Sequence, residues 1–515
     1  MSSFSSIALV QKTRTRGAMT IPVDFNDVGA ATIPTGTIFR SQADVDTALG
    51  AAVNFKFFSR VFDALPQEIA HVVTVNVAGG IQYADPAELD SLAFVIGTTT
   101  RPFSTLSGGA IIIQGDAPAN YSQVVSPLIV LSVDDGAVSS DPRITFSGTP
   151  FTGLNLKGLF AVASNGFVGI ISDNDNSSIG LNVQITPALT PGVTTVFMGR
   201  PNTELRNALS TTPTNRFKTS GGLRINVSAL GFGPNFEQGV EVRDININSM
   251  FGTWGSLSSS PTDQLSATFT RCLIDFVYQD SITATASNGR GWQASSGSLG
   301  LITCAMKATS VQSGTDEPIF ISSGAFVALI DSYIGEWSED PIIASGDNTI
   351  FLQRTVIDGI GNVNPSIQAT RSVVQADNSG HPTAFSKGRY NTIRNAPAAG
   401  GILMQQNSRW GRTTFSILNF EDCVGPCVVL RDTSQFLLDV RETQTGPHGI
   451  IGSGNLDVAF EVETGGGNYL ALDSDTTATG ANGDIRFSDG VIRPYDDVTN
   501  FGPLIDGTGN RVERK

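Results

Sequence analysis

The stretch FVALIDSYIG, residues 326–335, returns 23 residues later as TIFLQRTVID, residues 349–358. In this alignment four apolar residues fall on apolar residues, and one small polar residue falls on another. The matched pairs are Val327 with Ile350, Leu329 with Leu352, Ser332 with Thr355, Tyr333 with Val356 and Ile334 with Ile357. A unit this short, made of strands and turns, cannot bury its apolar face alone, but stacked copies can. The two stretches therefore predict a solenoid of β-strands.

Related runs predict that the solenoid occupies most of the chain. The order seen in the opening stretch occurs again in FTRCLI (269–274) and begins in FEDCV (420–424). Equivalent strands of neighbouring coils pair about 4.8 Å apart, so like residues form ladders, and Cys, Ser and Thr share one position here. We predict an all-β fold, a right-handed parallel β-helix with coils of about 23 residues. A sandwich or barrel is the alternative, but most connections lack the two-residue NG or DG turns of hairpins.

Four segments differ in composition and predict the domain organisation. Residues 1–38 contain two prolines and predict an extended arm, while 72–472 carry the β-helix. Between them, 39–71 predict a helical cap: Ser41 and Asp44 form a capping box, and SRVFDALPQEIA has apolar residues at helical spacing. Solenoids need such caps to cover their open ends. Residues 473–515 predict a linker followed by a hairpin-like module with the strands DIRF and VIRPY.

Composition excludes several functions. The net charge is −15, the pI is about 4.6, and only seven lysines are present, so no nucleic-acid partner is expected. Four cysteines without a CxxC spacing, together with three histidines, predict buried thiols and neither a metal nor another cofactor. The first residues lack the apolar core of a signal peptide, and no run of 18 apolar residues occurs. We therefore expect neither export by a signal peptide nor membrane insertion.

Local motifs give the chain a family resemblance. A helical segment followed by VVTVNVAGG (72–80) and IIIQGD (111–116) is similar to the entry into pectate-lyase-like β-helices. The ending GDIRFSDGVIRPYDD (483–497) resembles short modules that close phage tail and virion-surface proteins. The resemblance is to β-helical phage tailspikes and tail fibres. It implies a homotrimeric virion protein, a tailspike, tail fibre or surface-decoration subunit, that is assembled in the host cytoplasm, binds other virion proteins and recognises a bacterial surface polysaccharide. The arm at 1–38 would then serve virion attachment or assembly.

The same resemblance leaves enzymatic activity open. Polygalacturonase-like members carry GHG and RIK blocks, and this chain has neither. We therefore expect a structural protein first, with a polysaccharide depolymerase on the same β-helix, a hydrolase or a lyase, as the alternative.

The stretch LIDSYIGEWSED (329–340) supplies the catalytic candidates Asp331, Glu336 and Glu339. Glycoside hydrolysis uses two carboxyl groups, about 5.5 Å apart in retaining enzymes and about 6.5–9.5 Å apart in inverting ones. The alternative is that these side chains only face solvent on one coil. The alignment places Arg354 where Asp331 stands, so this position accepts either charge, which favours the scaffold interpretation.

Two further patterns also have simpler interpretations. The four tryptophans, Trp254, Trp292, Trp337 and Trp410, are predicted to lie on loops, where an aromatic face can stack on a sugar ring. Packing on the flank of the β-helix or in a subunit interface is the alternative. Asp173 and Asp175 in ISDNDNSS resemble the start of a calcium loop, but the later Gly and Glu of that motif are missing, so a polar loop is predicted.

Overall fold

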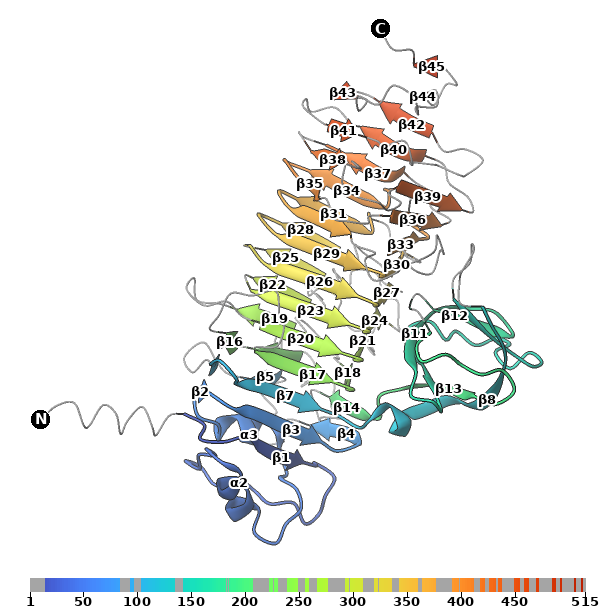
Figure 1. Cartoon of the computed structure of the whole chain (residues 1–515). Coiled ribbons are helices and arrows are strands. Elements are labelled where there is room, and N and C mark those ends of the chain that lie inside the picture. The colour runs from blue at the N-terminus through green and yellow to red at the C-terminus, as the bar shows by residue number, and fades with distance from the viewer. Residues whose placement is uncertain are drawn as a thin grey trace, which may run out of the picture. The chain divides into compact units, whose positions relative to one another are not determined.

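The structure is a computed structural model, and it is almost entirely β (Figure 1). The chain forms two compact units, the first made of Met1–Val124 with Gly199–Cys304 and the second of Val125–Met198 with Ala305–Lys515. The structure describes residues 14–83, 93–96, 103–134, 142–181, 183, 185–206, 222–225, 227–229, 239–248, 255–258, 266–276, 292–295, 297–308, 319–322, 324–335, 342–359, 364–376, 391–397, 399–411, 417–421, 426–431, 434–437, 449–453, 458–462, 469–471, 484–487, 491–492, 504–505 and 511–512.

The first unit holds strands in four parallel sheets. Its first sheet contains β1 (Met19–Val23), β3 (Val72–Val77), β7 (Ala110–Gln114), β17 (Val240–Arg243), β20 (Ser266–Thr270) and β23 (Ser298–Ile302). Its second contains β4 (Gly80–Tyr83), β14 (Thr203–Arg206), β18 (Asn246–Asn248) and β21 (Leu273–Phe276). Its third contains β5 (Ala93–Ile96), β15 (Gly222–Ile225), β19 (Gly255–Ser258) and β22 (Trp292–Ser295). A short fourth sheet contains β2 (Glu68–Ile69), β6 (Phe103–Thr105) and β16 (Val227–Ala229).

The second unit repeats the three-sheet pattern. Its first sheet contains β26 (Phe326–Ile330), β29 (Thr349–Gln353), β32 (Val373–Ala376), β35 (Arg409–Gly411), β38 (Gln435–Leu437), β41 (Tyr469–Ala471) and β43 (Val491–Ile492). Its second contains β24 (Ala305–Ala308), β27 (Tyr333–Gly335), β30 (Val356–Asp358), β33 (Asn391–Arg394), β36 (Ile417–Glu421) and β39 (Gly449–Ser453). Its third contains β25 (Ile319–Ser322), β28 (Ile342–Ser345), β31 (Ile367–Thr370), β34 (Ile402–Gln405), β37 (Pro426–Leu430), β40 (Val458–Val462) and β42 (Asp484–Phe487).

Strand register confirms the parallel β-helix. The alignment of the two repeated stretches is the observed one, since Val327 pairs with Ile350 across β26 and β29, and Ile334 with Ile357 across β27 and β30. The constant spacing of 23 residues is wrong, however. Hydrogen-bonded partners in successive coils are 23 residues apart at one corner, but 32 and 36 at others. Coils of different length fit because extra residues lie between strands and leave the ladder unchanged.

Polar ladders inside the coils occupy the positions that the alignment predicted. In the second unit Ser332 and Thr355 are each 1% exposed, and the Thr355 hydroxyl donates to the Leu329 carbonyl oxygen at 2.8 Å. In the first unit the Cys272 amide donates to Cys304 Sγ at 3.4 Å, and both cysteines are buried and form no disulfide. Small polar side chains suit these corners because a buried amide needs a partner wherever the strand ladder breaks.

The N-terminal region of the first unit, residues 14–71 (the cap), contains two helices, and part of the predicted arm is a strand of the first sheet. Helix α2 (Gln42–Leu49) begins with the predicted box, since the Ser41 amide donates to the Asp44 carboxylate at 3.0 Å. Helix α3 (Phe58–Asp63) is shorter than expected because Glu68–Ile69 already belongs to β2. Within the predicted arm, β1 pairs in parallel with β3. Residues 1–13 lie outside the described part of the chain.

An antiparallel barrel interrupts the predicted β-helix of residues 72–472. The barrel strands are β8 (Ser122–Asp134), β9 (Arg143–Phe146), β10 (Phe160–Ala163), β11 (Val168–Asn174), β12 (Ser178–Leu181) and β13 (Thr195–Arg200). They enclose a core of their own that includes Val130, Phe146, Phe151 and Met198. The barrel alternative to the solenoid therefore applies to this insertion.

The C-terminal hairpin prediction is wrong for the two strands on which it was based. The strand β42 pairs in parallel with β40, and β43 pairs in parallel with β41, so both continue coils of the second unit. A short antiparallel pair follows in β44 (Leu504–Ile505) and β45 (Arg511–Val512). The other domain boundaries stay predictions.

Candidate functional site

The predicted catalytic Asp331 forms the corner between β26 and β27. Its backbone has a φ of 51°, a left-handed conformation that Asp tolerates better than most residues. Its carboxylate accepts two hydrogen bonds from the Arg354 guanidinium, at 2.5 Å and 3.1 Å, and the two side chains are 20% and 16% exposed. Arg354 takes the same corner one coil later, also with positive φ. The pair stabilises neighbouring corners, which is a scaffold role and leaves this carboxylate engaged.

The other predicted site residues fall in three groups. Glu336, Glu339, Trp254 and Trp337 lie outside the described residues. Trp292 belongs to strand β22, although a loop was predicted there. The structure describes its backbone and not its side chain. Trp410 is 1% exposed, in β35, where it pairs with Val374 of β32. The prediction that Trp410 contacts glycan is therefore wrong, because its ring lies in the core of the coil.

A second Asp–Arg corner, in the first unit, includes a buried phenol that the sequence did not single out. The Tyr121 hydroxyl donates to Asp244 at 2.8 Å, and Asp244 accepts two bonds from the Arg271 guanidinium at 2.7 Å and 2.8 Å. Burial raises the pKa of the Tyr121 phenol, and the neighbouring Asp244 carboxylate raises it further. A phenol that stays protonated in this way holds its hydrogen bond over the whole physiological pH range. The cluster fixes the segment that leads into β8.

The second unit contains a buried ion pair that links the barrel to the coils. Lys157 Nζ lies 3.0 Å from Asp358 Oδ2, and the two side chains are 17% and 0% exposed. Asp358 also accepts a hydrogen bond from Asn395 Nδ2 at 2.8 Å, and the Tyr333 hydroxyl lies 3.4 Å from it. An acid, a phenol and an ammonium group thus converge, but their mutual hydrogen bonds and burial are those of a structural cluster. No local sequence motif indicates this ion pair, because Lys157 and Asp358 are 201 residues apart.

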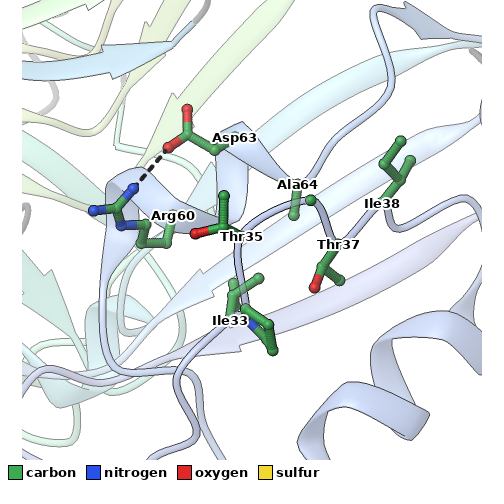
Figure 2. Close-up of a pocket in the computed structure, with 9 residues that line it drawn as sticks. Ile33, Thr35, Thr37, Ile38, Arg60, Asp63 and Ala64 are labelled. Atoms are coloured by element: carbon green, nitrogen blue, oxygen red, sulfur yellow. Dashed lines mark ion pairs between the residues drawn. The ribbon is translucent and has the colours of Figure 1, made fainter.

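A shallow pocket lies at the cap of the first unit (Figure 2). It has a volume of about 330 Å³ and is lined by the loop of residues 33–38 with Arg60, Asp63 and Ala64. Arg60 and Asp63 form an exposed ion pair at 3.5 Å, and Figure 2 shows them on the opposite side of the pocket from Ile38. Three apolar side chains of the cap reach solvent: Ile38, which lines the pocket, is 42% exposed, and Val28 and Val53, elsewhere in the cap, are 101% and 73% exposed. The pocket therefore combines apolar side chains, among them Ile33 and Ile38, with the Arg60–Asp63 ion pair.

The predicted polar loop is present at Asp175, whereas Asp173 belongs to β11. Asp175 follows β11 and accepts hydrogen bonds from the Ser177 and Ser178 amides, both at 2.7 Å, and from the Ser178 hydroxyl at 2.6 Å. The Ser178 hydroxyl and these amides lower the pKa of Asp175 to about 2. Arg143 pairs with both Asp173 and Asp175. Among the described residues no group of three or more His, Cys, Asp or Glu could hold a metal ion.

Comparison with known proteins gives no relative in sequence. No protein-family model matches the chain, and no curated protein does. In the part of the chain that the structure describes, no helix has both the length and the apolar character needed to cross a membrane.

Solved structures of phage tailspikes are similar to the chain. The gp54 tailspike of Acinetobacter baumannii bacteriophage AP22, solved with A. baumannii capsular saccharide, matches with a TM-score of 0.21 and 10% identity over 83% of this chain and 73% of gp54. Tailspike gp49 of Pseudomonas phage LKA1 matches with a TM-score of 0.26 and 10% identity, over 91% and 82%. Tailspike gp61 of Pseudomonas phage phi297 matches with a TM-score of 0.23 and 11% identity, over 94% and 80%. At these values the likeness assigns no role to any residue.

Proposed function

We propose that this chain is a virion protein of the phage tailspike or tail-fibre type, which binds a bacterial surface polysaccharide and assembles as a homotrimer. The observation that carries the proposal is the parallel β-helix, with coils in both units and a cap built from the N-terminal region. Stacked coils provide long, regular faces from which loops of variable length project, and such faces suit an extended polymer. Capsular saccharide, which gp54 holds in its complex, is the ligand class that we propose.

The cap is the proposed attachment surface for other virion proteins. Its pocket and the exposed Val28, Val53 and Ile38 supply apolar area that a partner protein can bury, and Arg60 and Asp63 supply charges at the rim. Apolar anchors within a polar rim are the usual composition of protein interfaces. The proposed location of the chain is accordingly the virion.

Polysaccharide cleavage stays the alternative to binding alone. The engagement of Asp331 with Arg354 favours binding, because a general acid or nucleophile needs a carboxyl group that can reach the substrate. Glu336 and Glu339 keep their place as catalytic candidates, and Trp254, Trp292 and Trp337 as glycan-contact candidates.

The first test combines mass and binding. Light scattering coupled to size exclusion gives the mass of the purified chain, which is 54.2 kDa as a monomer, and we expect three times that value. The same sample is then applied to a panel of purified capsular polysaccharides and O-antigens, with release of reducing ends measured in parallel. A trimer that retains one polysaccharide supports the proposal. A monomer that binds none of the panel contradicts it.

Variants then separate binding from cleavage. Trp337→Ala and Trp254→Ala are expected to weaken polysaccharide binding about two- to tenfold each, the value of one aromatic stacking contact. Asp331→Asn is the matched control and is expected to leave binding unchanged. If reducing ends are released, Glu336→Gln and Glu339→Gln identify the carboxyl group responsible, and unchanged release in both removes these two candidates.

A further inference from the structure

The Lys157–Asp358 pair is chemically different from the other ion pairs that the structure describes. In each of the others the cation is an arginine, whereas here it is a lysine. A guanidinium group stays protonated in proteins, but the amine of a lysine can form a covalent bond to a carbonyl carbon. The Asp358 side chain is fully buried, and that of Lys157 is 17% exposed. The pair thus combines a reactive amine with a carboxyl group that solvent does not reach.

Apolar side chains surround the pair on both sides of the seam between the barrel and the second sheet. On the barrel side, three buried residues lie outside the barrel's own core: Phe160, Val162 and Ile170. On the sheet side, three buried residues lie in register across β24, β27 and β30: Ala305, Tyr333 and Val356. Strand β11 packs against β27, and Asp358 shares a face of β30 with Val356, so the carboxyl group lies within this apolar seam. An ion pair in such surroundings has lost most of its hydration.

Hydrogen-bonding groups at the Asp358 carboxyl group favour attack on its carbon atom. Lys157 Nζ lies 3.0 Å from Oδ2, and the Tyr333 hydroxyl lies 3.4 Å from the same oxygen. Asn395 Nδ2 donates to the other oxygen, Oδ1, at 2.8 Å. A donor placed in this way stabilises the negative charge that develops on the oxygen when a nucleophile adds to the carbon. The amine, a hydroxyl beside the leaving oxygen and a donor to the developing oxyanion are therefore all in place.

Two glycines, each next to one member of the pair, hold these groups close together. Gly158 has a φ of 76°, and a Cβ placed on it would lie 3.1 Å from Lys307 Cδ. A Cβ on Gly359 would lie 2.8 Å from the Asn395 carbonyl oxygen. The barrel loop and the coil thus approach their neighbours at positions that favour glycine. Groups fixed in contact react as if they were highly concentrated, with effective molarities of about 10⁵ M or more in well-oriented systems.

We propose that Lys157 and Asp358 condense to an amide, which is a covalent cross-link between the barrel and the coils. One proton passes from Nζ to Oδ2 along the 3.0 Å contact, and the free amine adds to Cγ of Asp358. The negative charge of the adduct develops on Oδ1, to which Asn395 donates, and a second proton passes from Nζ to Oδ2. The bond between Cγ and Oδ2 then breaks, and one water molecule leaves. The product is a neutral secondary amide, and no oxidant or further reactant is consumed.

Burial favours this condensation over the ion pair. In water a lysine and a carboxylate stay ionised because both ions are hydrated, but in the seam most of that hydration is missing. The amide is uncharged, and its oxygen can still accept the hydrogen bond from Asn395. Hydrolysis of the amide requires a water molecule at a fully buried position, so the reverse reaction lacks its second reactant. The cross-link therefore removes two charges from an apolar site and is retained once it has formed.

The cross-link goes beyond the proposed function, because it holds whether or not the chain binds polysaccharide. It joins residues that are 201 positions apart and closes the chain into a loop that persists after unfolding. Like a disulfide, such a bond restricts the unfolded chain and so stabilises the fold. It also keeps the barrel attached to the coils when their other contacts are broken.

Mass spectrometry of the full chain tests the cross-link directly. The denatured wild-type protein is expected to weigh about 18 Da less than its sequence, the mass of one water. Trypsin does not cleave after an acylated lysine, so digestion of the unfolded protein should leave the bond after Lys157 intact. It should cleave after Lys307, which donates to the Lys157 carbonyl oxygen in the same seam and is the internal reference. Fragmentation should then identify one branched peptide that contains both Lys157 and Asp358.

The matched control is Lys157→Arg, because it keeps the cation and its pairing with Asp358 but cannot form the amide. Its measured mass should equal the mass of its sequence. A succinimide at Asp358–Gly359 would also lack one water, but it would persist in this variant, and hydroxylamine would open it. Loss of water that persists in Lys157→Arg would therefore overturn the proposal. A wild-type chain of full mass that trypsin cleaves after Lys157, both directly after purification and after prolonged incubation of the native protein, would overturn it as well.

Discussion

The coils and the barrel of the second unit both pair every strand and bury one face of it, but they do so in opposite ways. A coil strand pairs with a residue more than 20 positions away, as Val327 does with Ile350, and no single coil has a closed core. The barrel closes through short turns, such as the one between Phe160 and Ile170, which pair across β10 and β11. Its core residues all come from the one insertion.

This difference predicts how many strands lose stability when one core residue is replaced. In a stack, each coil depends on its two neighbours, so destabilisation of one coil passes to the next. In a closed barrel the whole core is shared by one cooperative body, so damage stays within it. Matched variants in the two regions can separate these behaviours.

The largest effect is expected from the barrel core. Phe146 is 2% exposed and meets Phe151 edge to face, with ring centroids 5.4 Å apart. Phe146→Ala removes this packing and leaves a cavity, which costs about 3–5 kcal/mol in such sites. Hydrogen exchange should show lost amide protection throughout β8–β13, with protection in β26–β34 kept. Lost protection in those coils as well would show that the barrel does not fold as a separate body.

The matched change in the coils is Leu352→Ala. Leu352 is 1% exposed and stacks in register with Leu329 of the preceding coil. We expect a cost of about 2–5 kcal/mol. Here amide protection should fall in β26, β29 and β32, which are neighbours in the sheet, while the barrel core keeps its protection. A loss confined to β29 would contradict the nearest-neighbour view of the stack.

A smaller effect is expected from the polar ladder. The Asn348 side chain accepts hydrogen bonds from the Gly324 and Ala325 amides, at 3.1 Å and 3.0 Å, and is itself 1% exposed. Asn348→Ala leaves both amides without this shared acceptor oxygen, and we expect the loss to cost about 1–3 kcal/mol. Urea unfolding measures the loss, and Asn348→Asp, which keeps an acceptor oxygen, should recover part of it. Equal stability of the Ala variant and wild type would mean that water replaces the amide.

A still smaller loss of stability is expected from the Asp331–Arg354 ion pair at the corner of the coil. Asp331→Asn keeps the size of the side chain and weakens its bond to Arg354, at a cost of about 1 kcal/mol for a partly exposed pair. The midpoint of urea unfolding measures this cost. If the variant also abolished a cleavage activity of the wild type, the scaffold assignment of Asp331 would be wrong.

The same contrast between coils and barrel explains how much of the fold the sequence could predict. Repetition reveals the coils, because Leu329 and Leu352 or Ser332 and Thr355 share an environment and therefore a residue type. The barrel strands at 127–133 and 142–148 alternate as coil strands do, so periodicity alone could not separate them. One signal was present: Asn165–Gly166 lies in the turn between β10 and β11, where Gly166 has a φ of 91° and donates to the Ala163 carbonyl oxygen. That dipeptide is a typical hairpin turn.

Candidate sites were predictable only where the repeat constrained them. The alignment already placed Arg354 on the position of Asp331, and the structure joins them. Trp410 beside Gly411 looked like a loop residue, yet its pairing with Val374 turns the ring inward, which only the register reveals. The Lys157–Asp358 pair joins an insertion to a coil, and a contact between two separately folded bodies leaves no pattern in either.

The smallest expected effect is a difference in acid sensitivity. The pKa of Asp175 in the folded barrel is about 2, below its ordinary value of 3.8, because the Ser178 hydroxyl and the Ser177 and Ser178 amides stabilise the carboxylate. A lowered pKa contributes stability that is fully present above the ordinary value and is lost as pH falls towards 2. Asp175→Asn should therefore make the stability of the barrel less dependent on pH between about pH 4 and 2. Urea unfolding, followed by pulse labelling of barrel and coil peptides at several pH values in this window, measures it. The slope should flatten for barrel peptides only, and an equal change in the coil peptides would mean that the two parts unfold together.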